Sequence, residues 1–181
     1  MVEDPKALKR TRGGRERLLV VATELFEAHS VAGTSLQMIA DRLGVSKPAI
    51  YHHFRSRDEI IGALMEPVFV DARAGVEHLE ALSDGKRRRA APQFYADFVV
   101  RHRRIINLVF FDRGALAGGL AETVDELVDG VGEMLASSHE TVRVDLGITL
   151  VYGAAALATR RQDLDDEQLR EVLVAVLGAK R

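Results

Sequence analysis

The chain has 181 residues, of which 47% are hydrophobic and 29% are charged, so it can bury the cores of a small domain and a larger one. It contains no cysteine, which excludes disulfides, thiolate metal sites and cysteine nucleophiles and fits the reducing cytoplasm, where we expect the protein to reside. The net charge of −2 is unevenly spread, because residues 1–60 carry 10 basic and 8 acidic side chains and the remainder carry 15 and 19.

The N-terminal segment, residues 1–14, is basic and ends in Gly13-Gly14, so we expect a flexible arm. It does not resemble a signal peptide, and the chain has no apolar run long enough to cross a bilayer, so no membrane partner is expected. From about Arg15 to His29 the apolar residues recur at helical spacing, which predicts a first helix. Its buried stripe comprises Leu18, Ala22, Leu25 and Phe26.

Three helix starts and one turn crowd into residues 34–59. Thr34 with Gln37 forms a possible capping box for a helix that ends at Gly44, because glycine readily adopts the left-handed conformation that ends helices. Ser46 is positioned to cap a short second helix, and Ser56 with Glu59 caps a third. Two helices joined by a short glycine turn, the second with an exposed polar face, predict a helix-turn-helix, the alternative being an ordinary helical hairpin.

Two long helical segments follow. The helix that begins at Arg57 meets Pro67, which should kink or break it, and its periodicity resumes up to a turn at residues 83–85. The basic run of residues 86–89 is interpreted first as a solvated loop and helix edge, and second as a partner surface. Five of the seven phenylalanines lie between Phe69 and Phe111, and they form either a plain aromatic core or the wall of an apolar ligand pocket.

Helical patterns at residues 121–137, 140–159 and 164–177 complete the chain, and the last two have broad apolar faces. The fold class is therefore all-α. Residues 15–60 are expected to form a three-helix helix-turn-helix domain, and residues 61–181 a second helical domain.

The string TSLQMIADRLGVSKPAIYHHFRSRDEII resembles the DNA-binding domain of tetracycline-repressor-like (TetR-type) regulators. The family pattern has a threonine opening its second helix, an I-A pair, G-V-S at the turn, and an aromatic pair before S-K/R-x-E. The specific match covers roughly residues 15–65. The rest of the chain resembles the family in length and helical pattern. The resemblance implies a homodimer that binds a double-stranded DNA operator. It also implies a connecting helix whose movement changes the distance between the two DNA-binding domains.

Roles in DNA binding are assigned from position on this pattern. Phosphate contacts are expected from Thr34, Tyr51, His52 and Arg57 and from the helix N-termini at Ser46 and Ser56. Base contacts are expected from Lys47, Gln37 and His53, and from Ala49 to a thymine methyl. Because Gln37 cannot both close its cap and read a base, one of its assignments must yield. The N-terminal arm is either a solvated tail or a segment that reaches DNA beside the first helix.

The resemblance also places an effector cavity and a dimer interface in the second domain. The predicted effector pocket comprises Phe69, Phe94, Tyr95, Phe98, His102, Ile106 and Phe110. Similar proteins dimerise through a four-helix bundle formed by the two C-terminal helices. The predicted dimer interface comprises Val142, Leu146, Leu150, Gly153, Ala154, Leu157, Leu169, Val172 and Val176.

No catalytic constellation is found. The six histidines fall into no metal-binding spacing, and neither a nucleophile elbow nor a glycine-rich phosphate loop is present, so we expect no enzyme activity, no metal and no cofactor. The sequence and the resemblance together predict a DNA-binding transcriptional regulator. The resemblance implies that it is a repressor, the usual case in this family, and that a small apolar effector releases it from a palindromic operator. The alternative is a DNA-binding or interaction protein with the same fold and no effector.

Overall fold

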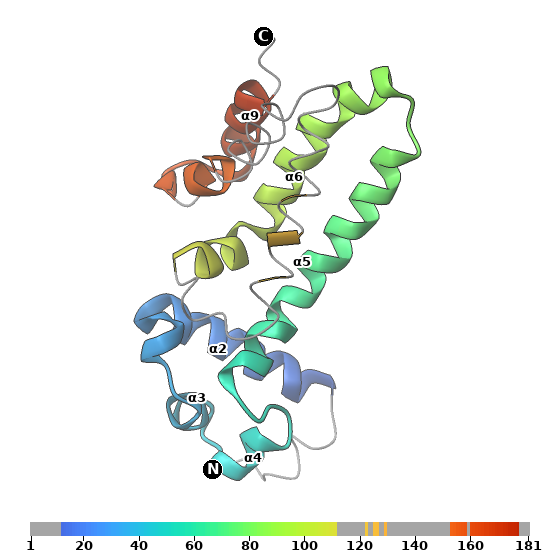
Figure 1. Cartoon of the computed structure of the whole chain (residues 1–181). Coiled ribbons are helices and arrows are strands. Elements are labelled where there is room, and N and C mark those ends of the chain that lie inside the picture. Colours follow the sequence, from blue (N-terminus) through green and yellow to red (C-terminus); the bar gives the residue numbers. More distant parts are fainter. Residues whose placement is uncertain are drawn as a thin grey trace. The chain divides into compact units, whose positions relative to one another are not determined.

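The computed structural model describes residues 12–111, 122, 125, 126, 129, 153–158 and 160–177. Every secondary-structure element within these ranges is a helix, which confirms the all-α prediction (Figure 1). Their bounds are α2 Arg12–Gly33, α3 Leu36–Leu43, α4 Lys47–Tyr51, α5 Arg57–Glu80, α6 Asp84–Phe111 and α9 Asp166–Leu177. Among these helices, none combines the length and hydropathy needed to cross a membrane.

The chain divides into two compact units, with a boundary between Glu66 and Pro67. Unit 1 contains α2, α3, α4 and the start of α5. Unit 2 contains the rest of α5, most of α6, and α9. The functional division that we expect from the sequence, at residue 60, stays a prediction.

The first helix is longer than expected at both ends. It includes residues 12–14, which the sequence had placed in the arm, and it continues past His29 to Gly33. The rest of the expected arm, residues 1–11, lies outside the described residues. Ser30 interrupts the helix with φ 64° and ψ 166°, a conformation that costs a residue other than glycine about 1–3 kcal/mol. The last turn of α2 is therefore distorted, and its carbonyl groups need donors from elsewhere.

Helix α3 contacts both α2 and α4, and its buried residues contribute to the core of unit 1. The predicted stripe of α2 is largely confirmed, since Leu18, Ala22 and Phe26 are buried and Leu25 is half-buried. The other buried apolar residues of this unit include Ile39, Ala40, Ile50, Phe54, Ile60 and Ile61.

The helix α5 runs through Pro67 without a break, so that part of the expectation was wrong. The chain leaves helical structure only at residues 81–83, and the basic run of residues 86–89 lies in the first turns of α6 and not in a loop. Arg87 explains why a cation is tolerated there. Its side chain donates through Nε to the carbonyl of Leu79 (3.1 Å) and through Nη2 to that of Leu82 (3.1 Å), so it neutralises the C-terminal end of α5.

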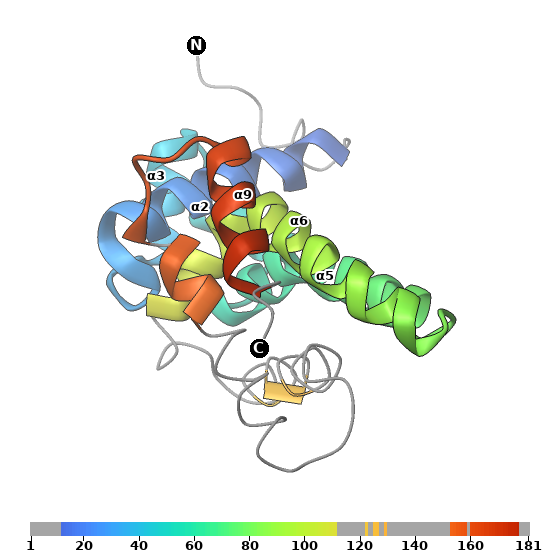
Figure 2. The same ribbon diagram turned by 90° about the horizontal axis from the view of Figure 1, so that it is seen from above.

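In unit 2 the helices α5 and α6 lie side by side and antiparallel, as both views show (Figures 1 and 2). Contacts pair Leu79 with Arg87 and Asp71 with His102. Between them, the Phe94 ring occupies the space where a Cβ atom on Gly75 would stand. Glycine is therefore required at position 75 for close approach of the ring, although its backbone conformation is ordinary for a helix.

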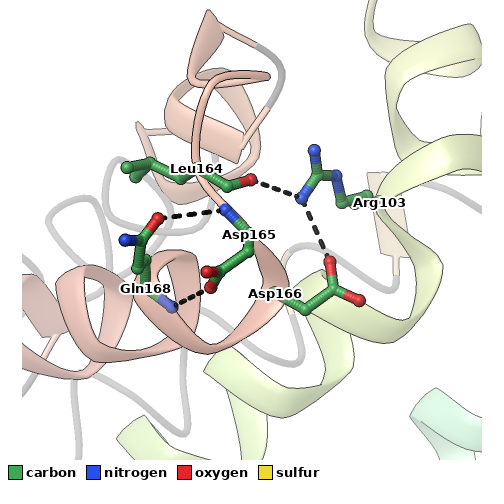
Figure 3. A network of polar contacts seen from close by, with 5 residues as sticks. All are labelled: Arg103, Leu164, Asp165, Asp166 and Gln168. Carbon is green, nitrogen blue, oxygen red and sulfur yellow. Dashed lines mark hydrogen bonds and ion pairs between the residues drawn. The ribbon is translucent and has the colours of Figure 1, made fainter.

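The last helix is fixed to α6 by polar contacts that Figure 3 shows in part. The side chain of Arg103 donates to the carbonyl of Leu164 (3.3 Å) and pairs with Asp166 (3.1 Å) at the start of α9. Asp165 and Gln168 close a reciprocal cap, in which each backbone N–H donates to the other side chain. The acidic residues Asp165, Asp166 and Glu167 thus lie at the start of α9. Leu169, Leu173 and Leu177 form the buried face of α9.

The close approach at Gly75 yields a stability prediction with a matched control in the same helix. Gly75→Ala should lower the free energy of unfolding by about 1–3 kcal/mol, because the new methyl group must displace the Phe94 ring. Gly62→Ala should instead raise it by about 0.5–1 kcal/mol, because a Cβ atom there meets nothing within 4 Å. Urea unfolding followed by circular dichroism measures both. Equal effects of the two substitutions would contradict the assigned packing.

Candidate nucleic-acid interface

The start of α3 differs from the predicted capping box. The N-cap is Ser35, whose hydroxyl accepts a hydrogen bond from the backbone N–H of Met38 (3.2 Å). Thr34 is 2% exposed, and its hydroxyl lies within donor distance of the carbonyls of Leu25 (3.1 Å) and Ser30 (2.8 Å). The assignment of Thr34 as the cap was therefore wrong. Its expected phosphate contact is not supported either, since the hydroxyl points into the protein.

Gln37 takes no part in the cap. Its side-chain amide donates to the carboxylate of Asp41 (2.7 Å), one turn further along the exposed face of α3. The conflict between capping and base reading is thus resolved against capping. Gln37 remains exposed at the surface of the helix.

The turn between α3 and α4 has the predicted geometry. Gly44 adopts the left-handed conformation, with φ 69° and ψ 31°, and its N–H donates back to the end of α3. The N–H of Val45 also donates to the carbonyl of Ala40 (3.0 Å). These bonds end α3 abruptly and redirect the chain into α4 within a few residues. A side chain other than glycine or asparagine at position 44 would be strained.

The short helix α4 presents a polar face to solvent. Lys47 and Tyr51 are exposed one turn apart, with the ammonium group 5.9 Å from the centre of the tyrosine ring. Ser46 is the N-cap by position, but its hydroxyl makes no capping hydrogen bond. Ile50 is fully buried, as predicted. Ala49 is also buried, at 4% exposed, so the proposed contact from its methyl group to a thymine was wrong.

The residues after α4 lead into α5. His52 is exposed and His53 is half-buried, and Phe54 anchors the segment in the core. The capping box at the start of α5 is confirmed, because the N–H of Glu59 donates to the hydroxyl of Ser56 (3.1 Å). The carboxylate of Glu59 accepts from the N–H of residue 55 (2.7 Å), one residue earlier than the usual box.

Arg57 does not project freely toward solvent, contrary to its assignment as a phosphate ligand. Its Nη1 atom lies within hydrogen-bond distance of the carbonyls of Val31 (2.9 Å), Ala32 (2.8 Å) and Thr34 (3.2 Å). The guanidinium group thus supplies the donors that the distorted end of α2 requires.

Arg15 was not identified from the sequence as part of the interface. Arg15 is exposed, and its guanidinium lies 5.0 Å from the centre of the Phe54 ring. A cation from α2 therefore lies next to the residues that follow α4. Its position in a basic stretch was a signal, but only the tertiary contact shows which part of the interface it joins.

The comparisons with known proteins agree with this geometry. Residues 18–64 match the family model described as bacterial regulatory proteins, tetR family. The transcriptional repressor KstR2 of Rhodococcus jostii (strain RHA1) is 32% identical over 165 residues, which cover 82% of this chain and 79% of KstR2. The chain is a member of the TetR family.

Two further similarities define how far the family relationship extends. The transcriptional activator FasR of Mycolicibacterium smegmatis is 34% identical over 98 residues, which cover 53% of this chain but only 45% of FasR. The crystal structure of AibR in complex with isovaleryl coenzyme A and operator DNA has a TM-score of 0.68 and 19% identity, over 92% of this chain and 99% of AibR. The TetR fold therefore extends over nearly the whole chain.

Four of the seven residues predicted to line a pocket in this TetR-family protein form one row in unit 2. The ring of Phe98 stacks against Phe94 (6.3 Å between centroids) and Tyr95 (6.1 Å), and the ring of His102 lies 5.0 Å away. Phe69 is buried and Ile106 is half-buried, whereas the side chain of Phe110 lies outside the described residues.

The polar end of this aromatic row is an ion-pair cluster. Nε2 of His102 lies 2.9 Å from Oδ2 of Asp71, and Nη1 of Arg101 donates to the same oxygen (3.0 Å). Hydrogen bonds from Arg101 and then His102 hold the pKa of Asp71 below its ordinary value. The carboxylate therefore stabilises the fold above the ordinary pKa of aspartate, and this contribution is lost as the pH falls through the lowered value.

The predicted dimer residues are only partly accessible in the single chain. Val142, Leu146 and Leu150 lie outside the described residues. Ala154 and Leu169 are buried within the protomer, at 1% and 0% exposed, so their side chains leave almost no surface for a partner, contrary to their assignment. The accessible positions are the exposed Gly153 and Val176 and the half-buried Leu157 and Val172.

The two serines before α3 and α4 give a test of the local geometry. Ser35→Ala should lower the free energy of unfolding by about 1 kcal/mol, because the N–H of Met38 loses its acceptor. Ser46→Ala should change it by no more than a few tenths of a kcal/mol, because its hydroxyl makes no capping bond. Urea unfolding of both variants distinguishes them. A larger loss for Ser46→Ala would show that the caps are assigned incorrectly.

Proposed function

We propose that this TetR-family regulator binds a palindromic operator as a homodimer and leaves it when a small apolar effector binds. The observation that carries the DNA-binding part is the exposed polar face of α4, which follows a glycine turn and is anchored by the buried Ile50. A short helix presented in this way fits the major groove of B-DNA. In a symmetric dimer two such helices read half-sites about one helical turn, or a multiple of it, apart.

The contacts are assigned from the exposed side chains. Lys47 reads a guanine edge in the major groove, and the Tyr51 ring beside it keeps the ammonium group near the helix. Tyr51 and His52 contact phosphates, together with backbone donors at the helix starts after Ser46 and Ser56. Gln37 and His53 are further base readers. Arg15 joins the phosphate contacts, because it is exposed beside Phe54.

An effector site in residues 61–181 is supported by the aromatic row that ends at His102. Phe94, Tyr95 and Phe98 form an apolar row, in which Tyr95 and Phe98 are buried, while His102, held by Asp71, supplies a polar group at one end. This combination suits a ligand with an apolar body and a polar end. AibR, which shares the fold, was crystallised with isovaleryl coenzyme A, so branched acyl thioesters belong among the compounds to be tested.

Dimerisation through the C-terminal helices is supported by the apolar surface that α9 leaves accessible. Val176 is 47% exposed although Leu169, Leu173 and Leu177 of the same helix are buried. Contiguous apolar surface is typical of subunit interfaces, and the half-buried Val172, one turn from Val176, extends the apolar surface of α9. Repression is the proposed direction of control, as for the repressor KstR2, whereas FasR is an activator.

DNA reading by α4 is tested with Lys47→Ala on a duplex that the wild-type protein selects from a randomised library. Affinity should fall roughly 5- to 160-fold, corresponding to about 1–3 kcal/mol, and the preference at one base-pair position should relax. Lys86→Ala, which removes the same charge from an exposed site on α6, is the control and should have little effect. A uniform loss across sequences would make Lys47 a phosphate contact, and failure of the wild type to select any duplex would refute the proposal.

Effector release is tested by adding lipophilic compounds and acyl thioesters to the protein and to its complex with the selected duplex. At least one compound should raise the melting temperature and also release DNA, because ligand binding stabilises the state to which it binds. A compound that stabilises the protein without releasing DNA serves as the control for binding unrelated to regulation. Release by no compound would favour a regulator without an effector.

A further inference from the structure

Arg57 occupies an unusual place in the DNA-binding unit. It is the first residue of α5, and its guanidinium reaches back 23 to 26 residues to three carbonyls, those of Val31, Ala32 and Thr34. The two oxygens at 2.8 Å and 2.9 Å are at the short distances of charge-assisted hydrogen bonds. The guanidinium is thus occupied by backbone oxygens at and just after the end of α2.

The carbonyls that Arg57 binds belong to a segment that is strained. Ser30 has a positive φ of 64°, so the chain after it no longer follows the regular hydrogen-bond pattern of α2. The hydroxyl of Ser30 accepts from the N–H of Gly33 (3.1 Å), and the hydroxyl of Thr34 lies within donor distance of two carbonyls of α2. Arg57 adds the charged donor, which is favoured at the C-terminal end of a helix.

The contact closes the helix-turn-helix at its two ends. Thr34 precedes α3, and Arg57 follows the segment that contains α4, so one guanidinium connects the residues by which the chain enters and leaves this motif. Between them α3 contacts both α2 and α4. Arg57 is therefore placed to hold α3 and α4 against α2 through contacts that lie entirely within the protein.

We propose that Arg57 is a positioning residue for DNA binding: it holds the end of α2 to the start of α5, and thereby keeps α3 and α4 in the arrangement that fits the groove, without contacting a phosphate. This inference rests on the proposed DNA-binding function. It assigns to Arg57 a role different from that of Arg55, which lies two residues earlier with an exposed side chain and which we place with the phosphate contacts.

The salt dependence of DNA binding distinguishes the two roles. For the full-length chain, the dissociation constant for the selected duplex is measured over a range of salt concentrations, well below the melting temperature of every variant. Arg57→Gln should weaken binding roughly 10- to 100-fold at each salt concentration, the scale of lost charge-assisted hydrogen bonds, and leave the slope of log Kd against log salt unchanged. Arg55→Gln is the matched control and should reduce the slope by about 0.9, as expected for one lost phosphate contact.

A second variant tests whether Arg57 acts through the turn that it binds. Thr34→Val removes a neutral hydroxyl from the same turn and cannot remove a charge contact to DNA. Its effect on affinity should be non-additive with that of Arg57→Gln, because both act on one structural element. Additive effects would place Arg57 outside this element and overturn the inference.

Two other outcomes would overturn the inference. If Arg57→Gln reduces the slope as Arg55→Gln does, Arg57 is a phosphate ligand. If Arg57→Gln lowers only the melting temperature and leaves DNA affinity unchanged, its role is general stability. Should Arg57→Gln not fold, nuclear magnetic resonance of the wild type replaces it. The guanidinium signals of Arg57 should then stay unchanged on adding duplex, whereas a shift refutes the inference. If the wild type selects no duplex, the proposed function itself fails, which is a distinct result.

Discussion

The carbonyl groups at the ends of helices and in the turns between them need donors, and in this protein arginines from other segments of the chain supply several of them. Arg57 binds the distorted end of α2, Arg87 binds the end of α5, and Arg103 binds the carbonyl of Leu164 just before α9. Each guanidinium is permanently charged and carries several donors, which suits it to groups of carbonyls that point the same way. These contacts hold the turns between the helices in addition to apolar packing.

This use of arginine divides the cations of the DNA-binding unit into two groups. Arg57 is occupied by backbone oxygens, whereas Lys47 and Arg15 lie over aromatic rings with their charges accessible. A cation over a ring is held weakly, so it can exchange that contact for a phosphate or a base at small cost. The division explains why cations of the same unit are proposed to have different functions.

In unit 2 the main constraint is steric. The Phe94 ring fills the space above Gly75, which allows α5 and α6 to lie close and brings Phe98 and His102 into one row with Asp71 at its end. The same row serves the fold and provides the groups that a ligand with a polar end would meet. Because the same residues suit both roles, the sequence could not decide between a plain aromatic core and the wall of a ligand pocket.

Structural features that depend only on neighbouring residues could be predicted from the sequence. Gly44 at the turn, the box of Ser56 with Glu59 and the burial of Ile50 all follow from residues within a few positions of one another, so they could be read without the tertiary structure. The sequence also determined the family, because the motif is contiguous. The side chains that remain available for DNA could be recognised only in the tertiary structure: Thr34 and Ala49 are buried, and Arg57 is bound to carbonyls 23 or more residues away. The physical reason is that the direction and reach of a side chain depend on what packs against it, and periodicity carries no information about partners distant in the chain.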